Sequence, residues 1–571
     1  MTVIRFALVF VLFTLISACG NDNAFVGNRS GTRLHDIGYK IKQLAFSWPS
    51  VADADTYRLL ENPDGVSGYS QIAGDFPATT TSFDYDIAVH LQDWANASYI
   101  LQSCIGTECT NSAARFATNS GAAIGYFKAS NTGVNDRFGH SVAVSDDGHT
   151  LAVGAWAEDS DPAVGEFDDS LLDSGAVYVF TRAADGWEGP VLIKASNADS
   201  DDQFGYSVAL SSDGSTLAVG AWQEAANSLN QSDNSSPGAG AVYVFVRNGV
   251  SGTWSQEVYL KAPNAGAGDH FGQSVTLSDD GNTLVVGAPD EDSNGSSQSD
   301  NSATNAGAIY TFVRSAGNWS HQAYLKASTA AADEGLGNAL SISSNGTVLA
   351  AAASVEDDGF NSNNGAVYLF SYGVAWTETA VLRASNAGTN DNFGTSVAIA
   401  GDGSTLLVGA PLEDSDGSGV NDNALNSGAA YVFVNNGGWV EQEMLKATVV
   451  GAFDQFGLSV AIDSIGGGVL AVGANREDGS ATGVGGDPQL NTVLDAGAAY
   501  IFTRDAGVWR QHNYLKPTNT GFGDRFGSAL AMSADGQTLL LSAIREDSTA
   551  TGIGGDQTNN SAANAGAVYL Y

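Results

Sequence analysis

Residues 138–155 read FGHSVAVSDDGHTLAVGA, and residues 175–182 read GAVYVFTR. In the first stretch, apolar residues alternate with small or polar ones on both sides of an Asp-Gly pair, which predicts two antiparallel strands joined by a tight turn. The second stretch predicts a third strand, and residues 187–196, which end in LIKAS, predict a fourth. One unit of this sequence therefore encodes four consecutive strands.

The unit occurs seven times after residue 124, and two markers identify each copy. The first marker is Phe-Gly, or Leu-Gly in the fourth unit, and it begins at Phe138, Phe204, Phe271, Leu336, Phe393, Phe456 and Phe526. The second is Gly-Ala-x-Tyr, and it begins at Gly175, Gly240, Gly307, Gly365, Gly428, Gly497 and Gly566. Seven units of four antiparallel strands predict an all-β fold, a seven-bladed β-propeller whose blades pack against their neighbours.

The ends of the repeat region indicate how the ring closes. The chain stops at Tyr571, inside the third strand of the seventh unit. Residues 124–129 (IGYFKA) precede the first Phe-Gly and match the fourth-strand ends of other units, such as residues 191–196 (VLIKAS). We expect this N-terminal strand to complete the seventh blade, which removes two open sheet edges. The predicted propeller domain covers residues 122–571.

The pattern FG…VGA…GAVY resembles the FG-GAP repeats of integrin α-subunits and of many bacterial surface and exported proteins. The resemblance covers all seven units, and residues 288–289 and 410–411 supply the Ala-Pro of the full motif. It implies a seven-bladed propeller used for binding and adhesion, often with calcium held in several blades.

Calcium-binding members of this family carry a D-x-D-x-D-G type loop between Phe-Gly and Gly-Ala-Pro. Here that segment is only a short turn, as in Asp146-Asp147-Gly148, which favours a hairpin over a metal site. The longer loop before Gly-Ala-x-Tyr is rich in Asp and Asn, whose oxygens suit calcium. The candidate calcium ligands are Asp159, Asp161, Asp292, Asn294, Asp414, Asp416, Asp422, Asp478 and Asp547.

Two further acidic series and one basic series follow the same period. A Glu opens each long loop, at Glu158, Glu224, Glu291, Glu356, Glu413, Glu477 and Glu546, and a base ends each fourth strand, at Lys128, Lys194, Lys261, Lys326, Arg383, Lys446 and Lys516. Either the Glu residues join an acidic metal-binding rim on one face of the ring, or they form ion pairs with these bases. The residues predicted to cap the turn before Phe-Gly are Asp136, Asp202, Asp269, Asp391, Asp454 and Asp524.

Trp156 and Trp222 follow Val-Gly-Ala in the first two units, where the other units have Pro, Ser, Asn or Ile. They are predicted to be either ligand-binding residues on one side of the ring or packing residues at a blade junction.

The N-terminus has the features of an export signal. Arg5 precedes an apolar run, residues 6–16, that is too short to span a membrane permanently. The following Ser-Ala-Cys resembles the bacterial lipobox, which implies a signal peptide over residues 1–18 and a diacylated Cys19. We expect an exported lipoprotein, anchored to the cell envelope in the outer membrane or at the cell surface, with a tether over residues 19–36.

Residues 37–118 form a separate region of short alternating runs divided by turn residues. Trp48, Tyr57 and Tyr99 resemble the core aromatics of a fibronectin type III domain, which implies a small β-sandwich. Cys104 and Cys109 are predicted to form a disulfide, because an exported protein meets an oxidising compartment and no further thiols or nearby histidines suggest a metal site.

The composition restricts the partners. The chain has 63 acidic and 23 basic residues and a net charge of -40, so it repels nucleic acids and anionic lipids. We expect a monomer that contacts the membrane only through its lipid anchor.

No catalytic motif occurs: the sequence has no nucleophile elbow, phosphate-binding loop or zinc-ligand spacing. We expect a non-enzymatic binding or adhesion module for a protein or glycan ligand, with calcium as its only cofactor. The alternatives are an envelope scaffold and a propeller-type polysaccharide lyase or hydrolase.

Overall fold

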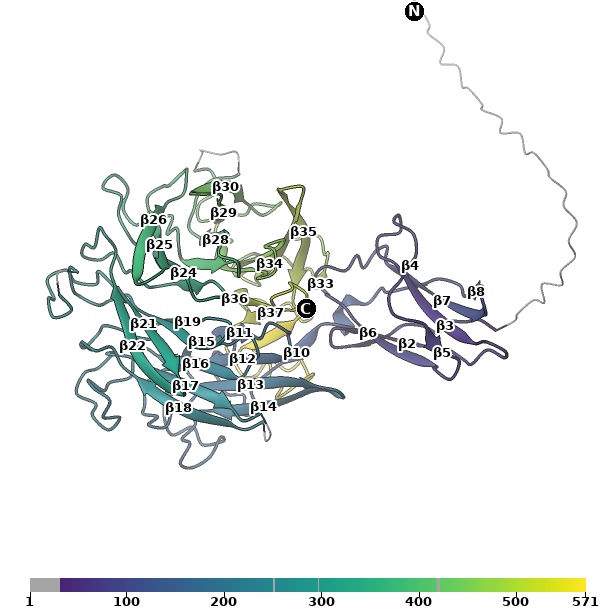
Figure 1. The fold of residues 1–571 in the computed structure, drawn as a ribbon, viewed down its shortest axis with the longest axis horizontal. Coiled ribbons are helices and arrows are strands. Elements are labelled where there is room, and N and C mark those ends of the chain that lie inside the picture. The colour runs from purple at the N-terminus through teal and green to yellow at the C-terminus, as the bar shows by residue number, and fades with distance from the viewer. Residues whose placement is uncertain (1–30, 250–251, 296, 418–421) are drawn as a thin grey trace, which may run out of the picture.

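The computed structural model describes residues 31–571 except 250–251, 296 and 418–421. The described chain forms a small two-sheet domain followed by a ring of seven four-stranded sheets (Figure 1). The predicted signal peptide and Cys19 lie outside the described residues. No helix in the described ranges is long and apolar enough to cross a membrane.

Each blade is an antiparallel sheet whose first strand lines the central channel. Blade 1 consists of β11 (Ser141–Val144), β12 (Thr150–Ala155), β13 (Ala176–Ala183) and β14 (Gly186–Ile193). Blade 2 consists of β15 (Phe204–Leu210), β16 (Thr216–Ala221), β17 (Ala241–Arg247) and β18 (Trp254–Leu260). Blade 3 consists of β19 (Ser274–Leu277), β20 (Thr283–Ala288), β21 (Ala308–Ser315) and β22 (Asn318–Leu325). Blade 4 consists of β23 (Leu340–Ile342), β24 (Val348–Ala353), β25 (Ala366–Tyr372) and β26 (Trp376–Leu382). Blade 5 consists of β27 (Ser396–Ile399), β28 (Thr405–Ala410), β29 (Ala429–Asn435) and β30 (Trp439–Leu445).

Blades 6 and 7 depart slightly from this pattern. Blade 6 consists of β31 (Phe456–Ile462), β32 (Val469–Ala474), β34 (Ala498–Asp505) and β35 (Val508–Lys516), and the short β33 (Gly483–Val484) adds to its outer edge. Blade 7 consists of β36 (Phe526–Met532), β37 (Leu539–Ala543), β38 (Ala567–Leu570) and, from the start of the repeat region, β10 (Gly125–Phe127). Gly125 pairs with Leu570 in antiparallel register, which confirms the predicted closure of the ring.

The two sequence markers meet at each blade junction. The backbone N–H of Phe204 donates to the carbonyl of Ser174 at 3.1 Å, and a parallel bridge joins Phe204 to Gly175. A Cβ added to Gly175 would lie 2.0 Å from the Phe204 carbonyl oxygen, so only glycine fits there. Within the blade, the Phe204 ring packs edge-on against Tyr243 at 5.3 Å. The repeat is therefore a contact between neighbouring blades as well as a unit of secondary structure.

The glycine of Val-Gly-Ala has a similar role nearer the channel. A Cβ on Gly154 would lie 2.0 Å from the Gly205 carbonyl oxygen of the next blade. Ser141 Oγ donates to the same carbonyl at 2.8 Å. The equivalent bonds at other junctions join Ser207 to Gly272, Ser274 to Gly337, Ser396 to Gly457 and Ser459 to Gly527. Channel-lining serines therefore connect the blades.

The short Asp-Gly segments are hairpin turns, as predicted. In blade 1, Asp147 Oδ1 accepts from Ser145 Oγ at 2.6 Å and from the backbone N–H of His149 at 2.9 Å. Gly148 adopts a φ of 69°, a value that favours glycine. These carboxylates are used to hold the turn.

The small domain is a β-sandwich. One sheet contains β1 (Gly38–Lys40), β2 (Gln43–Ser47) and β6 (Ser82–Asp86), and the other contains β3 (Thr56–Asn62), β4 (Ser70–Gln71), β5 (Phe76–Pro77), β7 (Ser98–Ile105), β8 (Glu108–Asn111) and β9 (Arg115–Phe116). Trp48, Tyr57 and Tyr99 are buried in its core, and Cys104 and Cys109 form a disulfide between β7 and β8. Leu34 is also buried, so the domain begins before residue 37 and the tether is shorter than predicted.

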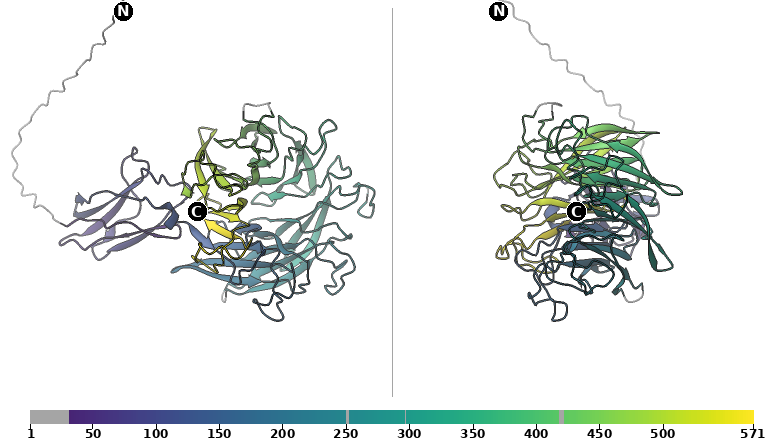
Figure 2. Two further views of the ribbon diagram at one scale, coloured as in Figure 1. Left: turned by 180° about the vertical axis from the view of Figure 1, so that it is seen from behind. Right: turned by 90° about the vertical axis from the view of Figure 1, so that its left-hand side faces the viewer.

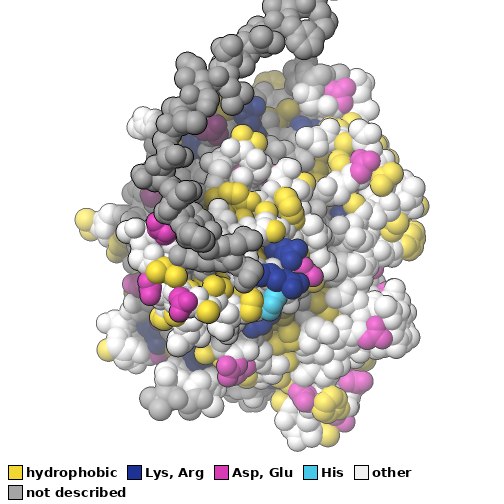
Figure 3. All heavy atoms as spheres, turned by 90° about the vertical axis from the view of Figure 1, so that its right-hand side faces the viewer, with side chains coloured by type: hydrophobic (Ala, Val, Ile, Leu, Met, Phe, Trp, Pro, Cys, Tyr) yellow, Lys and Arg dark blue, Asp and Glu magenta, His cyan; other side chains and the backbone are white. Residues whose placement is uncertain are grey.

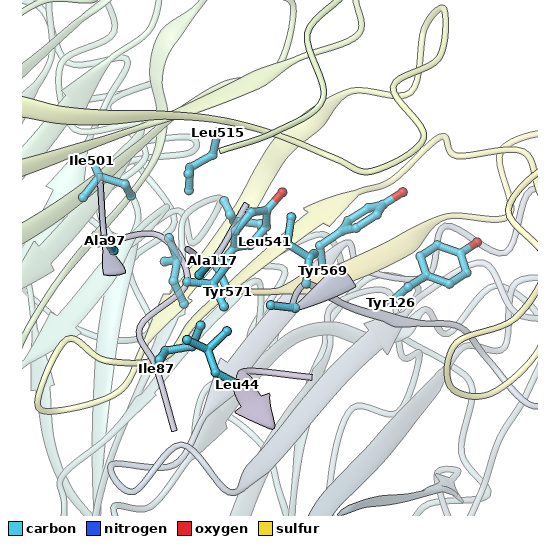
Figure 4. Close-up of a cluster of buried hydrophobic side chains, with 14 of the residues drawn as sticks. Leu44, Ile87, Ala97, Ala117, Tyr126, Ile501, Leu515, Leu541, Tyr569 and Tyr571 are labelled. Carbon is cyan, nitrogen blue, oxygen red and sulfur yellow. The ribbon is translucent and has the colours of Figure 1, made fainter. Parts of the chain in front are cut away.

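The sandwich packs directly against the propeller, beside the C-terminus (Figure 2). One continuous buried cluster contains Leu44 and Ile87 of the sandwich together with Leu541 and Tyr571 of blade 7 (Figure 4). Seen from the sandwich side, acidic side chains are scattered over the surface and do not form one continuous patch (Figure 3).

Two polar side chains in this interface are buried. Lys42 Nζ donates to the Gln537 carbonyl and to Thr538 Oγ1, both at 2.5 Å, and His90 Nε2 lies 3.0 Å from the Gly536 carbonyl oxygen. Burial lowers the pKa of Lys42 to about 7. These hydrogen bonds go to the short-turn end of blade 7.

Candidate functional site

Beneath the long loops lies a ring of buried ion pairs. In blade 1, Lys194 Nζ donates to Glu158 Oε2 at 2.7 Å, and Asn131 Nδ2 donates to the other carboxylate oxygen at 2.7 Å. The equivalent pairs are Lys261–Glu224, Lys326–Glu291, Arg383–Glu356, Lys446–Glu413, Lys516–Glu477 and Lys128–Glu546. All seven Glu residues are buried, so the ion-pair interpretation is confirmed and the expected acidic rim of Glu side chains is wrong.

The Asp residues before Phe-Gly cap their turns, as predicted. Asp136 Oδ2 accepts from the backbone N–H of Gly133 at 2.6 Å. Burial, and secondarily the nearby carboxylate of Glu158, raise the pKa of Asp136 to about 7 against the Gly133 hydrogen bond, which lowers it. Burial likewise raises the pKa to about 7 for Asp202, Asp454 and Asp524 and to about 6 for Asp269 and Asp391.

Five of the nine candidate calcium ligands hold the ends of their own loops together. Asp159 Oδ1, for example, accepts the backbone N–H of Asp173 at 2.7 Å, fourteen residues along the chain. The same bond joins Asp292 to Asn305, Asp414 to Asn426, Asp478 to Asp495 and Asp547 to Asn564. These carboxylates therefore have a structural use in the loops.

The other four candidates lie farther along the loops. Asp161 Oδ1 accepts from the N–H of Ala163 at 2.8 Å, and Asn294 Nδ2 donates to Ser302 Oγ at 2.9 Å. Asp416 and Asp422 flank the segment 418–421, which lies outside the described residues. Within the described ranges, no three His, Cys, Asp or Glu side chains are grouped as metal ligands, and calcium binding stays a prediction.

Several positions that differ from blade to blade surround the mouth of the channel, on the long-loop face. We call them the inner rim: in each blade, the residues before and after Phe-Gly and the two residues after Val-Gly-Ala. The channel below holds a cavity of about 270 Å³, lined by all seven blades. A neighbouring cavity of about 380 Å³ at the rim of blades 3 to 5 is lined by Gln273, Asp290 and Asn338, among others.

A row of aromatic rings covers the inner rim of blades 1 to 3. The ring of His140 lies 6.0 Å from Trp156 and 4.6 Å from Tyr206, measured between centroids. Trp222 lies between Tyr206, at 4.7 Å, and His270, at 4.5 Å. The structure thus brings Trp156 and Trp222 into one row, joined by three rings that the sequence analysis did not select. All five residues are only partly buried.

Hydrogen bonds fix the middle and the end of this row. Trp222 Nε1 donates to Gln203 Oε1 at 2.6 Å. His270 Nδ1 lies 2.5 Å from Asp290 Oδ2, and its Nε2 lies 3.2 Å from Gln223 Nε2. The sequence alone does not single out His270, because Asp290 is twenty residues away and only the blade geometry brings the two together.

Blades 6, 7 and 1 place arginine at the inner rim instead. Arg137 and Arg525 precede Phe-Gly, Arg476 is the second residue after Val-Gly-Ala, and Arg545 is the second residue after the equivalent Leu-Ser-Ala of blade 7. We call these four residues the arginine arc. The sequence signal was available, since no other unit has a base at these offsets, but the positions become neighbours only when the ring closes.

The FG-GAP repeat family matches this chain over residues 126–180, 187–245, 254–312 and 376–433. No curated protein sequence matches it.

Among solved structures, the chain is similar to hydrazine synthase of Kuenenia stuttgartiensis, with 14% identity, coverage of 72% of this chain and 93% of that one, and a TM-score of 0.43. It is also similar to a periplasmic gluconolactonase of Pseudomonas aeruginosa (14% identity, 82% and 98% coverage, TM-score 0.40) and to the WD40 repeats of RRP9 (9%, 78% and 96%, TM-score 0.42). Because the sequence identities and TM-scores are low, these similarities carry no argument about function. The chain is therefore a seven-bladed β-propeller in which the matched segments are FG-GAP repeats.

Proposed function

We propose that this protein is a non-enzymatic binding protein that holds a protein or glycan ligand on the inner rim of its propeller. The observation that carries the proposal is the aromatic row of His140, Tyr206, Trp222 and His270, with Trp156 beside it. Tyr and Trp are enriched among the residues that dominate binding energy at protein interfaces. Their concentration on one side of a repetitive ring therefore favours a recognition surface.

The row is also held in place before any ligand arrives. Trp222 is confined by two neighbouring rings and by its hydrogen bond to Gln203. A side chain that is already ordered loses little conformational entropy on binding, so such a surface binds more tightly than a mobile one of the same composition.

The contacts of the rim histidines favour binding over catalysis. His270 and Asp290 resemble two members of a catalytic triad, but the remaining ring nitrogen of His270 faces the Gln223 amide. A nucleophilic mechanism needs a hydroxyl or thiol at that position. Burial, and secondarily Arg137, lowers the pKa of His140 to about 4, so this residue is a neutral ring at physiological pH.

We further propose that the protein is exported and anchored to the cell envelope through Cys19. The support is the apolar segment before Cys19 and the disulfide between Cys104 and Cys109, which suits an oxidising compartment. Metabolic labelling with a radioactive fatty acid tests the anchor, because the label is expected in the wild-type chain and not in Cys19→Ala.

The binding proposal is tested with the full-length protein on a glycan panel and on immobilised surface proteins. The variant Trp156→Ala/Trp222→Ala is expected to bind at least about tenfold more weakly, as truncation of a hot spot does. Phe360→Ala is the matched control, because Phe360 is an aromatic residue of the blade 4 long loop and is 96% exposed. Both variants should keep the wild-type melting temperature (Tm) within a few degrees.

Two results would count against the proposal. If the double Trp variant binds as the wild type does, the aromatic row is not the binding surface. If the wild type converts a glycan and His270→Gln loses that activity, the protein is an enzyme of the lyase or hydrolase class.

A further inference from the structure

The arginine arc is unusual for so acidic a chain. Seven of the 23 basic residues are used in the ion pairs beneath the loops, and four of the others gather at the inner rim of three adjacent blades. At the offset of Arg137 and Arg525 the other blades carry Gln, His, Gly or Asn. The four arginines are therefore not part of the sequence pattern that the seven units share.

The backbone places these residues side by side across the seam of the ring. The N–H of Arg545 donates at 3.1 Å to the carbonyl of Asp524, which directly precedes Arg525. The N–H of Arg137 in blade 1 donates at 3.3 Å to the carbonyl of Asn564 in blade 7. Closure of the propeller thus brings residues from both ends of the repeat region into one cluster.

The arginines are close enough to affect one another. Burial lowers the pKa of Arg525; Asp495 raises it, and the positive charges of Arg476, Arg545 and Arg137 lower it again. Like charges that are held together, partly out of water, are stabilised by a bound counter-charge.

Guanidinium N–H groups of the arginine arc are available to a ligand. Among the described residues, Arg525 is the one member of the arc with an ion pair, to Asp495 at 3.2 Å. The Nε atoms of Arg476 and Arg525 are buried and have no hydrogen-bond partner. Buried donors in native proteins are nearly always satisfied, and an oxyanion bound at the channel mouth would supply acceptors to this cluster.

The geometry of guanidinium specifies an oxyanion. Its planar fork makes two parallel hydrogen bonds to a carboxylate, sulfate or phosphate group. Such bonds are stronger than those between neutral partners, and they fix the orientation of the group that is bound.

The arc and the aromatic row form one continuous surface. The N–H of His140, which begins the row, donates to the carbonyl of Arg137 at 3.0 Å. Amides and a hydroxyl, such as those of Gln223, Gln273 and Thr395, occupy other positions of the same rim. Ring surfaces, uncharged hydrogen-bonding groups and an oxyanion site together match a sugar chain that carries acidic groups. An acidic peptide would use the arginines but would leave the ring row and the amides without a defined partner.

We infer that the inner rim binds an anionic glycan, whose carboxylate or sulfate groups contact the arginine arc and whose sugar rings lie over the aromatic row. This inference rests on the proposed binding function and names its ligand class. The charged groups of the glycan replace the acceptors that the arc lacks.

The test is titration of the full-length protein with four probes at low and moderate salt: oligogalacturonate, chondroitin sulfate, neutral dextran and polyglutamate. Oligogalacturonate carries only carboxylates and chondroitin sulfate carries both carboxylates and sulfates, so a preference for the second probe would show that sulfate contributes to recognition. We expect binding of at least one of them, weakened by salt, and a loss of about tenfold or more in Arg137→Gln/Arg545→Gln. Arg510→Gln is the matched control, since Arg510 is exposed on β35 at the outside of blade 6. The single variant Arg545→Gln removes an exposed side chain and guards against a folding defect in the double variant.

The outcomes separate a failure of the anionic-glycan ligand from a failure of the proposed binding function. Equal binding of dextran and the acidic glycans, lost in Trp156→Ala/Trp222→Ala but not in the arginine variants, would keep the proposed function and overturn the anionic ligand. A preference for polyglutamate would make an acidic protein segment the ligand and overturn the glycan. Absence of binding to both acidic glycans would also overturn the inference.

Discussion

Two layers on the same face of the propeller differ in almost every respect. The ion-pair layer beneath the long loops repeats in all seven blades as a buried Glu paired with Lys, or with Arg383 in blade 4. The inner rim, directly beside it, changes from aromatic rings in blades 1 to 3 to arginines in blades 6, 7 and 1. The comparison suggests that repetition marks what builds the ring and that departure from repetition marks what the ring binds.

The largest expected effect comes from breaking one buried ion pair. In Glu546→Gln, Lys128 keeps its buried position but loses its carboxylate, which is expected to cost about 3–5 kcal/mol of unfolding free energy. Chemical denaturation measures the loss. The control Glu188→Gln, on the exposed part of β14, should change little. A loss below 1 kcal/mol in Glu546→Gln would mean that the ion-pair layer is not what stabilises the blades.

A smaller loss is expected at the blade junctions. Gly154→Ala places a methyl group against the Gly205 carbonyl of the next blade, and such overpacking typically costs about 1–3 kcal/mol. The control is Gly74→Ala, because a Cβ at Gly74 meets nothing within 4 Å. If both variants unfold at the wild-type temperature, the close approach of blades at Val-Gly-Ala is not a constraint.

Calcium tests the long loops above the ion-pair layer. If calcium is present at ten times its dissociation constant, the native state is expected to gain about 1.4 kcal/mol. The Tm should therefore be higher in millimolar calcium than with a chelator. Asp422→Asn should reduce the gain, and Asp185→Asn, at an exposed turn outside the long loops, should not. An identical Tm in calcium and in chelator would remove the calcium prediction.

The last expected effect is that of pH, and it acts through the six Asp residues that cap the turns before Phe-Gly. The six capping Asp residues have pKa values of about 6 to 7 in the folded protein, above the ordinary value near 3.8. The folded state therefore binds more protons than the unfolded state between pH 4 and pH 7, and stability falls as pH rises. The Tm should therefore be higher at pH 5 than at pH 7, by about 1 °C for each kcal/mol of stability in a chain of this length. Asp136→Asn should flatten the curve, whereas a Tm that rises between pH 5 and pH 7 would contradict the assignment.

Periodicity predicted most of the fold because each marker residue makes the same kind of contact in all seven blades. Gly175 and Phe204 contact each other at a junction, so both recur with the period of the blade. The ring closure was predictable for the same reason, since residues 124–129 match a strand that the seventh unit lacks.

The candidate site was predicted only in part, because it depends on the positions where the period fails. Trp156 and Trp222 were recognisable as departures, but their connection through His140 and Tyr206 requires the spatial order of the blades. The docking of the sandwich was not predicted either. Its contacts, such as those of Lys42 with blade 7, join residues almost five hundred positions apart and have no repeat to reveal them.

The strand β10 has a mechanical consequence. It is the outermost strand of blade 7, it pairs with β38 over three residues, and the chain that enters it comes from the sandwich. With an anchor at Cys19 and a ligand on the rim, tension would run through the sandwich into this seam. The buried interface around Leu44, Ile87 and Tyr571 lies in parallel with the seam and shares the load. An anchor upstream of the sandwich would therefore pull on the docked interface as well as on the three-residue pairing of β10.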